Sequence, residues 1–497
     1  MSSIDEIRDI RIKKLKLLQD RGVNPYPADA KRELSLKKAG ENFDDLEKNK
    51  DLKWISGRVM SIRGQGAIVF ITLYDGTGSF QGLLKKDVLG EEKLNFWNEV
   101  VDIGDFVELQ GIFFKTNRGE KTLEAKDWRM LSKSLRPLPE EWHGLVDVEE
   151  RFRKRYLDIL MNEEVKELFE KKAKFWNVIR EYLLAKDFLE VETPVIENTT
   201  GGADARPFIT HHNALDLEVY MRISAGELWQ KKLLVGGFPR TFEIGRIFRN
   251  EGISNEHLQD YTQLEYYMAF ADYEEGMKMT RELYILIGEK VFGTTKFKIK
   301  DFEIDLSGQW EKYDFCKIIE DKFGLNPVTE VYNKTGKKAT KEDLKNICIG
   351  AGVEYEEMEA NFVRVVDNLW KVIRKEIAGP GFLINVPVSL EPLAKRNRNN
   401  TPTVERFPVI LAGSEMGKGF SELNDPIDQY GRFMEQQALR DAGDEEAQMA
   451  DMDFVEALEY AMPPAFGFGL SERLFSFLVD KPVREAQLFP LMRPNKD

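Results

Sequence analysis

The sequence has 497 residues, and 72 Lys and Arg against 86 Asp and Glu give a formal net charge of −14. Its 42% apolar and 11% aromatic content supports a folded protein of two to four domains, at roughly 100 to 200 residues each, and excludes a disordered or collagen-like chain. No stretch approaches the roughly 18 apolar residues that cross a bilayer, and the first residues lack the apolar centre of a signal peptide. We therefore expect a cytoplasmic protein with no membrane partner.

Residues 1–50 are expected to hold a short amphipathic helix and a lead-in. Apolar Ile4, Ile7 and Ile10 recur at helical spacing, and the helix should end before Gly22. The opposite face carries five cations, namely Arg8, Arg11, Lys13, Lys14 and Lys16. Such a face is either simply solvated or an arm that meets phosphate, and the residues alone favour the solvated face.

Residues 51–134 change to short runs rich in β-branched and aromatic residues, with turn residues at 75–78. Five such strands in about 80 residues indicate a small closed barrel, and the OB-fold is the common five-stranded barrel that binds oligonucleotides through exposed aromatic side chains. Phe70 and Gln81 are candidates for that contact. A Phe in a strand is more often part of the core, so the pattern leaves both interpretations of Phe70 open.

A proline-rich stretch within residues 135–150 predicts a linker, and a helical pattern over 163–185 marks the start of a larger domain at 151–497. An extended segment that contains Pro194 follows the helix. Residues 297–380 are rich in Lys and Glu and carry no chemical motif. We expect them to form a helical insertion in the larger domain.

The chemically informative block is residues 241–270, and no P-loop or dinucleotide-binding glycine loop accompanies it in the sequence. Arg249 and Glu251 should share one face of a strand and its loop, and Glu265 and Tyr267 one face of the next strand. A fixed guanidinium can hold a phosphate with two hydrogen bonds, and nearby carboxylates can hold an ammonium. The alternative is a solvated hairpin with ion pairs, which the residues alone would favour.

Three segments, in order along the chain, resemble the three motifs of class II aminoacyl-tRNA synthetases: FLEVETPVI, FRNE and FGFGLSERLFSFL. Further stretches, TTGGADARPF, GFSELNDPIDQ and LFPLMRP, narrow the resemblance to the lysyl-tRNA synthetases. The resemblance implies an α+β protein with an N-terminal OB-fold β-barrel that reads the anticodon. A class II catalytic domain would follow, with an antiparallel six-stranded sheet flanked by helices, and the protein would be a homodimer.

The same resemblance implies roles for individual residues. Arg249 and Arg473 match the catalytic arginines, and Glu415 matches a ligand of Mg²⁺, the cofactor that would accompany the substrates ATP, L-lysine and tRNA(Lys). The lysine-binding positions are matched by Gly202, Glu227, Glu265, Tyr267, Phe420 and Glu422, with Lys418 beside them. The ATP-binding positions are matched by Arg249, Glu251, His257, Tyr261 and Arg473, and the anticodon-reading positions by Phe70, Gln81 and Glu120.

These residues suit a reaction that needs no covalent nucleophile. In the reaction that the resemblance implies, the lysine carboxylate attacks the α-phosphorus of ATP, pyrophosphate leaves, and lysine then passes to the 3′ end of tRNA(Lys). The protein need only position the substrates and neutralise charge. We therefore expect an ATP-dependent enzyme that joins lysine to tRNA.

Four departures from the family pattern bear on this site. Pro408 stands where the family has a second metal-binding Glu, and Lys418 stands where the family has an Asn. Gly226 is a one-residue insertion before Glu227, and the third motif is one residue short. Together they leave open how many Mg²⁺ ions the site holds.

Three other interpretations remain. An aspartyl- or asparaginyl-tRNA synthetase would share the motifs, but its pocket needs cations where Glu265 and Glu422 stand. A lysyl-synthetase paralogue that modifies a protein would lack the anticodon domain predicted here. A divergent non-catalytic tRNA-binding paralogue is opposed by the retained Arg249 and Arg473, although the four departures are compatible with it.

Overall fold

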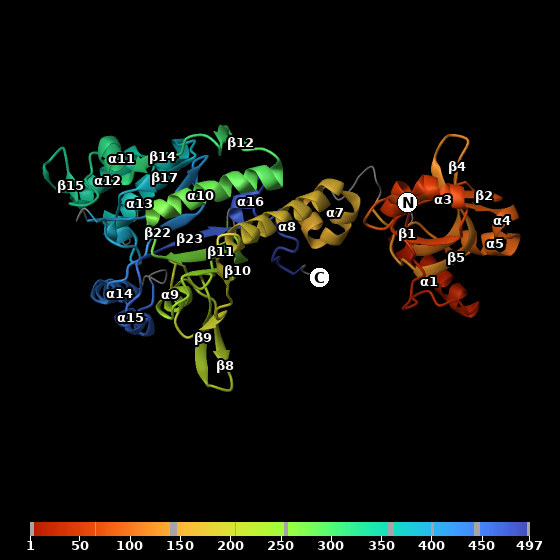
Figure 1. The fold of residues 1–497 in the computed structure, drawn as a ribbon, viewed down its shortest axis with the longest axis horizontal. Coiled ribbons are helices and arrows are strands. Elements are labelled where there is room, and N and C mark those ends of the chain that lie inside the picture. Colours follow the sequence, from red (N-terminus) through yellow and green to blue (C-terminus); the bar gives the residue numbers. More distant parts are fainter. Residues whose placement is uncertain are drawn as a thin grey trace. The chain divides into compact units, whose positions relative to one another are not determined.

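The computed structural model describes residues 4–64, 66–139, 147–203, 205–252, 257–355, 362–398, 402–441 and 448–494. The chain separates into two compact units, Met1–Val148 and Glu149–Asp497, which Figure 1 shows in red to orange and in yellow to blue. No helix in these described ranges is long and apolar enough to cross a membrane.

The first unit is built on five strands that close into a ring in the order β1-β2-β3-β5-β4. Alternate residues of β2, such as Val69, Ile71 and Leu73, are fully buried inside it, because successive side chains of a strand point to opposite faces. Neighbouring strands are antiparallel except β3 and β5, which are parallel. The strands are β1 (Lys53–Arg63), β2 (Ile68–Tyr74), β3 (Ser79–Lys85), β4 (Phe106–Lys115) and β5 (Lys121–Ser132). The closed five-stranded ring predicted from the sequence is confirmed.

Five helices of the described residues accompany this ring, and the first of them corrects one expectation. Arg11 was expected on the solvated face of the N-terminal helix, but it is 7% exposed. Its guanidinium donates hydrogen bonds to the carbonyl oxygens of Ile103 and Arg136, both at 3.0 Å. Arg11 therefore anchors the helix and is not part of a cationic face. The helices are α1 (Ile4–Asp20), α2 (Leu36–Glu41), α3 (Phe43–Asn49), α4 (Lys86–Leu89) and α5 (Glu91–Val100).

The second unit is organised around a sheet in the order β22-β23-β11-β10-β6. The long hairpin of β10 and β11 and the strands β23 and β22 are antiparallel, whereas β6 is parallel to β10. Among the described residues this sheet has five strands, one fewer than the six expected. The strands are β6 (Leu189–Glu190), β10 (Arg240–Phe248), β11 (Asp260–Ala269), β22 (Lys418–Ser421) and β23 (Ala465–Ser471).

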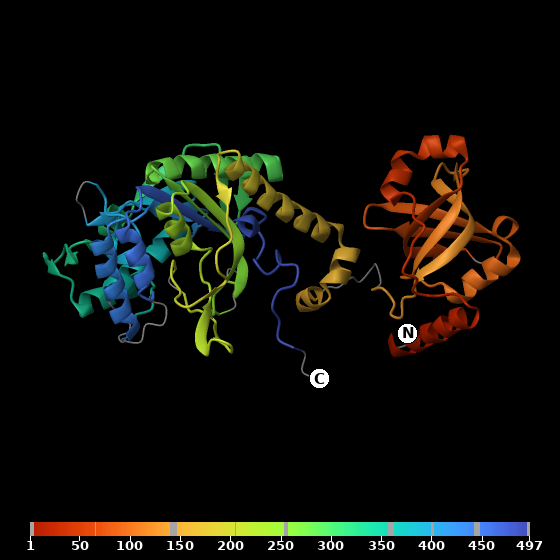
Figure 2. The same ribbon diagram turned by 60° about the horizontal axis from the view of Figure 1, so that its bottom comes forward.

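The two faces of this sheet have different partners. Leu264, Tyr266, Phe466 and Phe468 point to one face and join a core with α8 (Glu163–Leu184) and α10 (Tyr273–Ile287), and both helices run along that face in Figures 1 and 2. The alternate residues of β11 and β23 point to the opposite face, against which α9 (Glu227–Val235) packs. The alternation predicted for the hairpin thus separates a packed apolar face from a face that carries polar side chains.

The segment 297–380 differs from the expected helical insertion, because short strands alternate with its helices. Its elements are β12 (Lys296–Ile299), β13 (Phe302–Asp305), β14 (Glu311–Asp314), α11 (Phe315–Phe323), β15 (Val331–Tyr332), β16 (Lys337–Lys338), α12 (Lys341–Gly350), α13 (Phe362–Ile373) and η2 (Arg374–Glu376). Strand β14 pairs with β17 (Gly381–Ile384) in a second sheet, β14-β17-β20-β21, which also contains β20 (Val409–Leu411) and β21 (Ser414–Glu415). Helix α13 shares one hydrophobic core with residues of this sheet. The segment is therefore integrated into the second unit.

The remaining elements connect these sheets. Strands β7, β9 and β8 form a small sheet, and β18 pairs with β19. Their bounds and those of the other short elements are α6 (Val148–Arg153), α7 (Arg155–Met161), β7 (Ile196–Glu197), β8 (Ile209–His212), β9 (Leu217–Met221), η1 (Gly288–Phe292), β17 (Gly381–Ile384), β18 (Val386–Pro387), η3 (Val388–Leu390), β19 (Thr403–Val404), β20 (Val409–Leu411), β21 (Ser414–Glu415), α14 (Pro426–Asp441), α15 (Met452–Glu459) and α16 (Arg473–Leu478).

Candidate active site

A cavity of about 450 Å³ lies on the polar face of the main sheet. Its wall contains side chains from β11, β22 and β23 together with residues from the loops and helices around them. Every residue to which the family resemblance gives a role with lysine, ATP or metal lines this one cavity: Gly202, Glu227, Arg249, Glu251, His257, Tyr261, Glu265, Tyr267, Glu415, Lys418, Phe420, Glu422 and Arg473. The fold thus brings together side chains from sequence positions more than 200 residues apart.

Glycines keep the floor of the cavity open. A Cβ atom at Gly467 on β23 would lie 2.4 Å from both Oε1 of Glu422 and the Tyr267 ring. Gly202 has a φ of +87°, and a Cβ there would lie 2.8 Å from the side chain of Glu227. Any larger residue at either position would push a carboxylate away, so both glycines preserve space beside the acidic side chains.

Glu265 is held rigidly at the centre of the cavity. Its Oε1 accepts hydrogen bonds from the backbone N–H of Ala225 at 2.8 Å and from Nε2 of Gln263 at 2.6 Å. Its Oε2 accepts one from the hydroxyl of Tyr267 at 2.8 Å. Burial, reinforced by the carboxylate of Glu227, raises the pKa of Glu265. A cation that enters the cavity would relieve that cost by stabilising the ionised form.

Glu422 is 1% exposed, and its Oε2 lies 2.5 Å from Nζ of Lys231. Apart from this ion pair, neither oxygen of Glu422 accepts a hydrogen bond from the part of the chain that the structure describes. Burial raises its pKa, an effect that Lys231 opposes and Glu227 reinforces. A buried carboxylate with unused acceptor capacity is costly, and it indicates a position for an ammonium group of a ligand.

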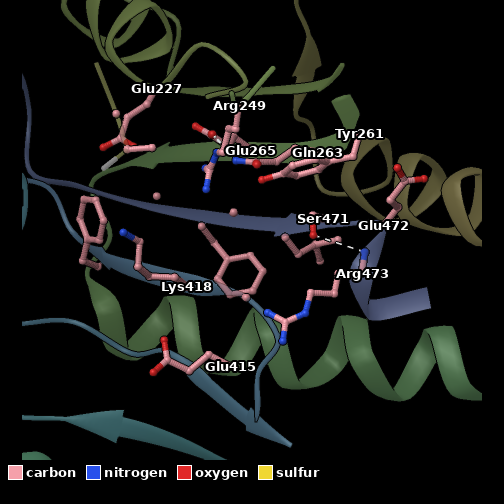
Figure 3. A pocket seen from close by; sticks show the side chains of 18 of the residues that line it. Glu227, Arg249, Tyr261, Gln263, Glu265, Glu415, Lys418, Ser471, Glu472 and Arg473 are labelled. Atoms are coloured by element: carbon pink, nitrogen blue, oxygen red, sulfur yellow. Dashed lines mark hydrogen bonds between the residues drawn. The ribbon is translucent and has the colours of Figure 1, made fainter. Parts of the chain in front are cut away.

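The two arginines lie on opposite sides of the cavity, as Figure 3 shows. Arg249 extends from the same side as Glu227 and Glu265, and Arg473 from the side of Glu415 and Lys418. The Nε of Arg249 donates to the carbonyl oxygen of Ile223 at 3.2 Å, and its guanidinium lies 5.8 Å from the centre of the Tyr261 ring. An anion in the space between the arginines would meet positive charge from both sides.

The position of Glu251 has a different cause from the one expected. Strand β10 ends at Phe248, so Arg249 and Glu251 lie in the following loop and strand alternation does not fix their sides. The backbone N–H of Arg249 donates to the carbonyl oxygen of Gln259, and that of Glu251 donates to the carbonyl oxygen of Arg249. This loop geometry places both side chains at the cavity.

The insertion Gly226 is the N-cap of α9, and its φ of +76° suits a glycine.

The surroundings of Glu415 fit its expected role as a Mg²⁺ ligand poorly. Oε1 of Glu415 accepts a hydrogen bond from Nε1 of Trp370 at 2.8 Å and lies 3.2 Å from Nη1 of Arg374. Burial alone would raise the pKa of Glu415, but Arg406 and Arg374 outweigh it and hold the pKa below its ordinary value. No group of three or more His, Cys, Asp or Glu side chains among the described residues could hold a metal ion. Among the described residues, Glu415 is therefore a single carboxylate already paired with Arg374, and it is not part of a cluster of metal ligands.

Two cations of the protein also pair with Glu391, close to the cavity wall that Lys418 lines. Nζ of Lys418 and Nε of Arg406 each lie 3.1 Å from Oε2 of Glu391, which is 4% exposed. Burial would raise the pKa of Glu391, but these two cations outweigh it and lower the pKa. Pro408 accepts a hydrogen bond from the backbone N–H of Leu383. Lys418 thus stands beside a buried acid, Glu391, that protein cations already neutralise, and Pro408 supplies no carboxylate.

In the first unit, the three expected anticodon positions lie on or beside neighbouring strands. Phe70 on β2 is half-buried, Gln81 on β3 is half-buried, and Glu120 just before β5 is exposed. Nε2 of Gln81 donates to Oγ1 of Thr122 at 2.8 Å, and Nη2 of Arg63 donates to Oε1 of Gln81 at 3.0 Å. Arg63 also pairs with Phe70 in the β1–β2 register, so the two residues are neighbours on adjacent strands.

Sequence reasoning missed several residues at these sites. Gln263, Arg374 and Glu472 line the cavity, and Lys231 binds the carboxylates behind its wall. Glu227 and Lys231 are four residues apart on α9, a spacing that brings oppositely charged side chains together on a helix and was a usable signal for their ion pair. Arg374 carried no signal, because its segment has no motif and its place beside Glu415 depends on tertiary packing.

Comparison with known proteins agrees with this arrangement. Residues 147–493 match the family of class II tRNA synthetases (D, K and N), and residues 53–131 match the OB-fold nucleic acid binding domain. The lysine–tRNA ligase of Thermotoga maritima is 41% identical across 99% of this chain and 97% of its own length. Those of Pelotomaculum thermopropionicum and Carboxydothermus hydrogenoformans are each 42% identical across 99% of this chain, and across 96% and 99% of their own lengths. The family match alone would admit the aspartate and asparagine enzymes, but these relatives are lysine enzymes. The chain belongs to the class II tRNA synthetases and, within them, to the lysine–tRNA ligases.

Proposed function

We propose that this chain activates L-lysine with ATP to lysyl-adenylate and pyrophosphate, and then transfers lysine to the 3′ end of tRNA(Lys). The observation that carries the proposal is the group of three buried carboxylates, Glu227, Glu265 and Glu422, in one cavity with Arg249 and Arg473. Buried carboxylates select a substrate with ammonium groups, because an apolar or acidic side chain would leave part of their negative charge and hydrogen-bonding capacity uncompensated.

In the first step an oxygen of the lysine carboxylate attacks the α-phosphorus of ATP, and the bond from that phosphorus to the pyrophosphate oxygen breaks. Arg249 and Arg473 face the cavity from opposite sides and stabilise the negative charge that develops on the phosphoryl oxygens. In the second step the tRNA hydroxyl attacks the lysyl carbonyl carbon, and AMP leaves. Catalysis here is positioning and charge stabilisation, without a covalent nucleophile.

The lysine substrate is oriented by its two ammonium groups. Glu265, Tyr267 and Glu422 would surround the ε-ammonium, with the ring of Phe420 along the aliphatic stem. Gly202 and Glu227 would hold the α-ammonium. Tyr261 and Arg473 would enclose the adenine. Glu251 would lie at the edge of the adenine, and His257 would lie at the outer phosphates. Lys418 would contribute positive charge near the substrate carboxylate.

Three further parts of the proposal rest on the family resemblance. The OB-fold unit would read the anticodon through Phe70, Gln81 and Glu120. The enzyme would act in the cytoplasm as a homodimer. A contact between two copies could use exposed apolar side chains such as Leu189 and Ile196, which are 45% and 54% exposed. Sedimentation would test the dimer. Glu415 is paired with Arg374, so the steps above rely on the two arginines and not on a magnesium ion held by Glu415.

ATP–pyrophosphate exchange measured with each of the twenty amino acids tests the proposal. Lysine alone should support rapid exchange, and charging should follow when tRNA(Lys) is added. Exchange that depends on aspartate or asparagine would assign the chain to the related enzymes. A complete lack of exchange with all twenty, from protein that binds tRNA, would favour a non-catalytic tRNA-binding paralogue.

A further inference from the structure

A lysine of the protein itself lies among the substrate carboxylates. Lys231 on α9 has a side chain that is 1% exposed, and its Nζ lies 2.7 Å from Oε1 of Glu227 and 2.5 Å from Oε2 of Glu422. The rings of Phe420 and Tyr267 lie 5.3 and 5.9 Å from the same Nζ. These are the groups that the proposed function assigns to the substrate lysine, so Lys231 shares its surroundings with the ligand.

In both Glu227 and Glu422, the two carboxylate oxygens have different surroundings. Lys231 uses Oε1 of Glu227, whereas Oε2 of Glu227 faces Gly202, where a Cβ would lie only 3.1 Å away. Lys231 uses Oε2 of Glu422, whereas Oε1 of Glu422 lies against Gly467. Both glycines line the cavity. Each carboxylate therefore binds Lys231 with one oxygen and presents the other toward the space for the substrate.

The charges lead to the same conclusion. Glu227, Glu265 and Glu422 carry three negative charges when ionised, and a lysine substrate brings only two ammonium groups. One resident cation leaves two net negative charges, which matches the two ammonium groups of the substrate. Burial alone would lower the pKa of Lys231, but Glu227 and Glu422 outweigh it and raise the pKa, so the side chain remains charged.

We propose that Lys231 is a positioning residue for lysine recognition, which fixes one oxygen each of Glu227 and Glu422 and leaves the other oxygen of each for an ammonium group of the substrate. This inference rests on the proposed function of the cavity. It adds a residue that does not itself line the cavity but acts through two that do. Without Lys231, the two carboxylates would repel each other and a third charge would stay unbalanced.

Three variants test the proposal by lysine-dependent exchange. Lys231→Met removes the cation at nearly constant length, Lys231→Arg keeps the charge in a larger group, and Lys232→Met is the control on the same helix, where Lys232 lies 3.8 Å from Asp451 and outside this cluster. Lys231→Met should raise the KM for lysine at least thirtyfold and leave the KM for ATP within threefold. Lys231→Arg should raise the lysine KM less than Lys231→Met does, and the lysine KM of Lys232→Met should match that of the wild type.

Two outcomes of the Lys231→Met measurement would overturn the inference. One is a lysine KM within threefold of the wild type. The other is a parallel rise in both KM values with a lower melting temperature, which would show a merely structural role. If Lys231→Met does not fold, Lys231→Arg decides. A rise in the lysine KM with the KM for ATP within threefold would support the positioning role, and a parallel rise in both KM values would refute it. A wild type that does not use lysine would instead refute the proposed function.

Discussion

Nη1 of Arg374 lies 3.2 Å from Oε1 of Glu415, so the carboxylate expected to bind a metal is paired with a cation of the protein. A divalent cation at Oε1 would meet that guanidinium at close range, and Mg²⁺ needs oxygen ligands in near-octahedral geometry. We therefore expect calorimetric titration of the ligand-free protein to show no saturable Mg²⁺ binding below about 1 mM, weaker than the range of dedicated cation sites.

Arg374→Met should create measurable Mg²⁺ binding in the same titration, because it frees the carboxylate of Glu415. Arg374→Lys is the matched control that keeps the ion pair and should behave as the wild type. Tight Mg²⁺ binding by the unaltered, ligand-free protein would contradict the assignment of Glu415 to Arg374.

Glu422→Gln should weaken the use of lysine strongly. Breaking a buried charge pair costs roughly 3 to 5 kcal/mol, and Glu422 is both buried and paired with Lys231. We expect the KM for lysine in pyrophosphate exchange to rise at least about a hundredfold, about 2.7 kcal/mol, with the KM for ATP little changed. Glu459→Gln, at an exposed position of α15, is the surface control. A lysine KM within fivefold of wild type would remove Glu422 from the ammonium site.

Lys418→Ala should lower the rate of lysyl-adenylate formation about tenfold, about 1.4 kcal/mol. The change removes a positive charge from the cavity wall and leaves the buried Glu391 with Arg406 as its remaining cation. Lys418→Arg keeps the charge and should retain most of the rate. Single-turnover measurements at limiting ATP make the comparison, and a rate within twofold of wild type for the Ala variant would mean that Lys418 serves Glu391 alone.

The stability of the protein should depend on pH through Glu197, which is 8% exposed and accepts a hydrogen bond from Nε1 of Trp229 at 2.7 Å. Burial raises the pKa of Glu197 to about 7, above the roughly 4.3 of an unfolded chain. Because the pKa of Glu197 is higher in the folded than in the unfolded chain, its contribution to stability is fully present at a pH below the unfolded-state pKa. That contribution is lost as the pH rises through the folded-state pKa.

Between pH 5.5 and 8 the loss should be on the order of 2 kcal/mol. Melting temperatures measured across this range should fall for the wild type relative to Glu197→Gln, which cannot ionise and preserves the hydrogen bond to Trp229. Parallel curves for the two proteins would show that Glu197 has an ordinary pKa in the fold.

Phe70→Ala should weaken tRNA charging without affecting adenylate formation. Stacking of a base on an aromatic side chain contributes roughly 1 to 3 kcal/mol, so the KM for tRNA(Lys) should rise between about fivefold and a hundredfold. Ile68→Ala is the control on the same strand, since Ile68 is 47% exposed. If both variants charge tRNA as well as wild type at limiting tRNA, Phe70 has no role in anticodon binding.

The sequence by itself determined the strand pattern of the first unit and the hairpin of the second. Alternation along residues 260–269 predicted that Glu265 and Tyr267 share a face, and in the structure they do, opposite Leu264 and Tyr266. This worked because the direction of a side chain in a strand follows from its position in the chain. The motif resemblance supplied the remaining site residues, which no local pattern would have joined.

Only the tertiary structure decided which charges neutralise one another. Lys231 meets Glu422, and Arg374 meets Glu415, across long stretches of chain, and neither contact has a local signature. Arg11 likewise looked like a surface cation until the fold supplied carbonyl oxygens around it. The physical reason is that an ion pair depends on distance and burial, and both are fixed by the packing of elements that the order of residues does not place side by side.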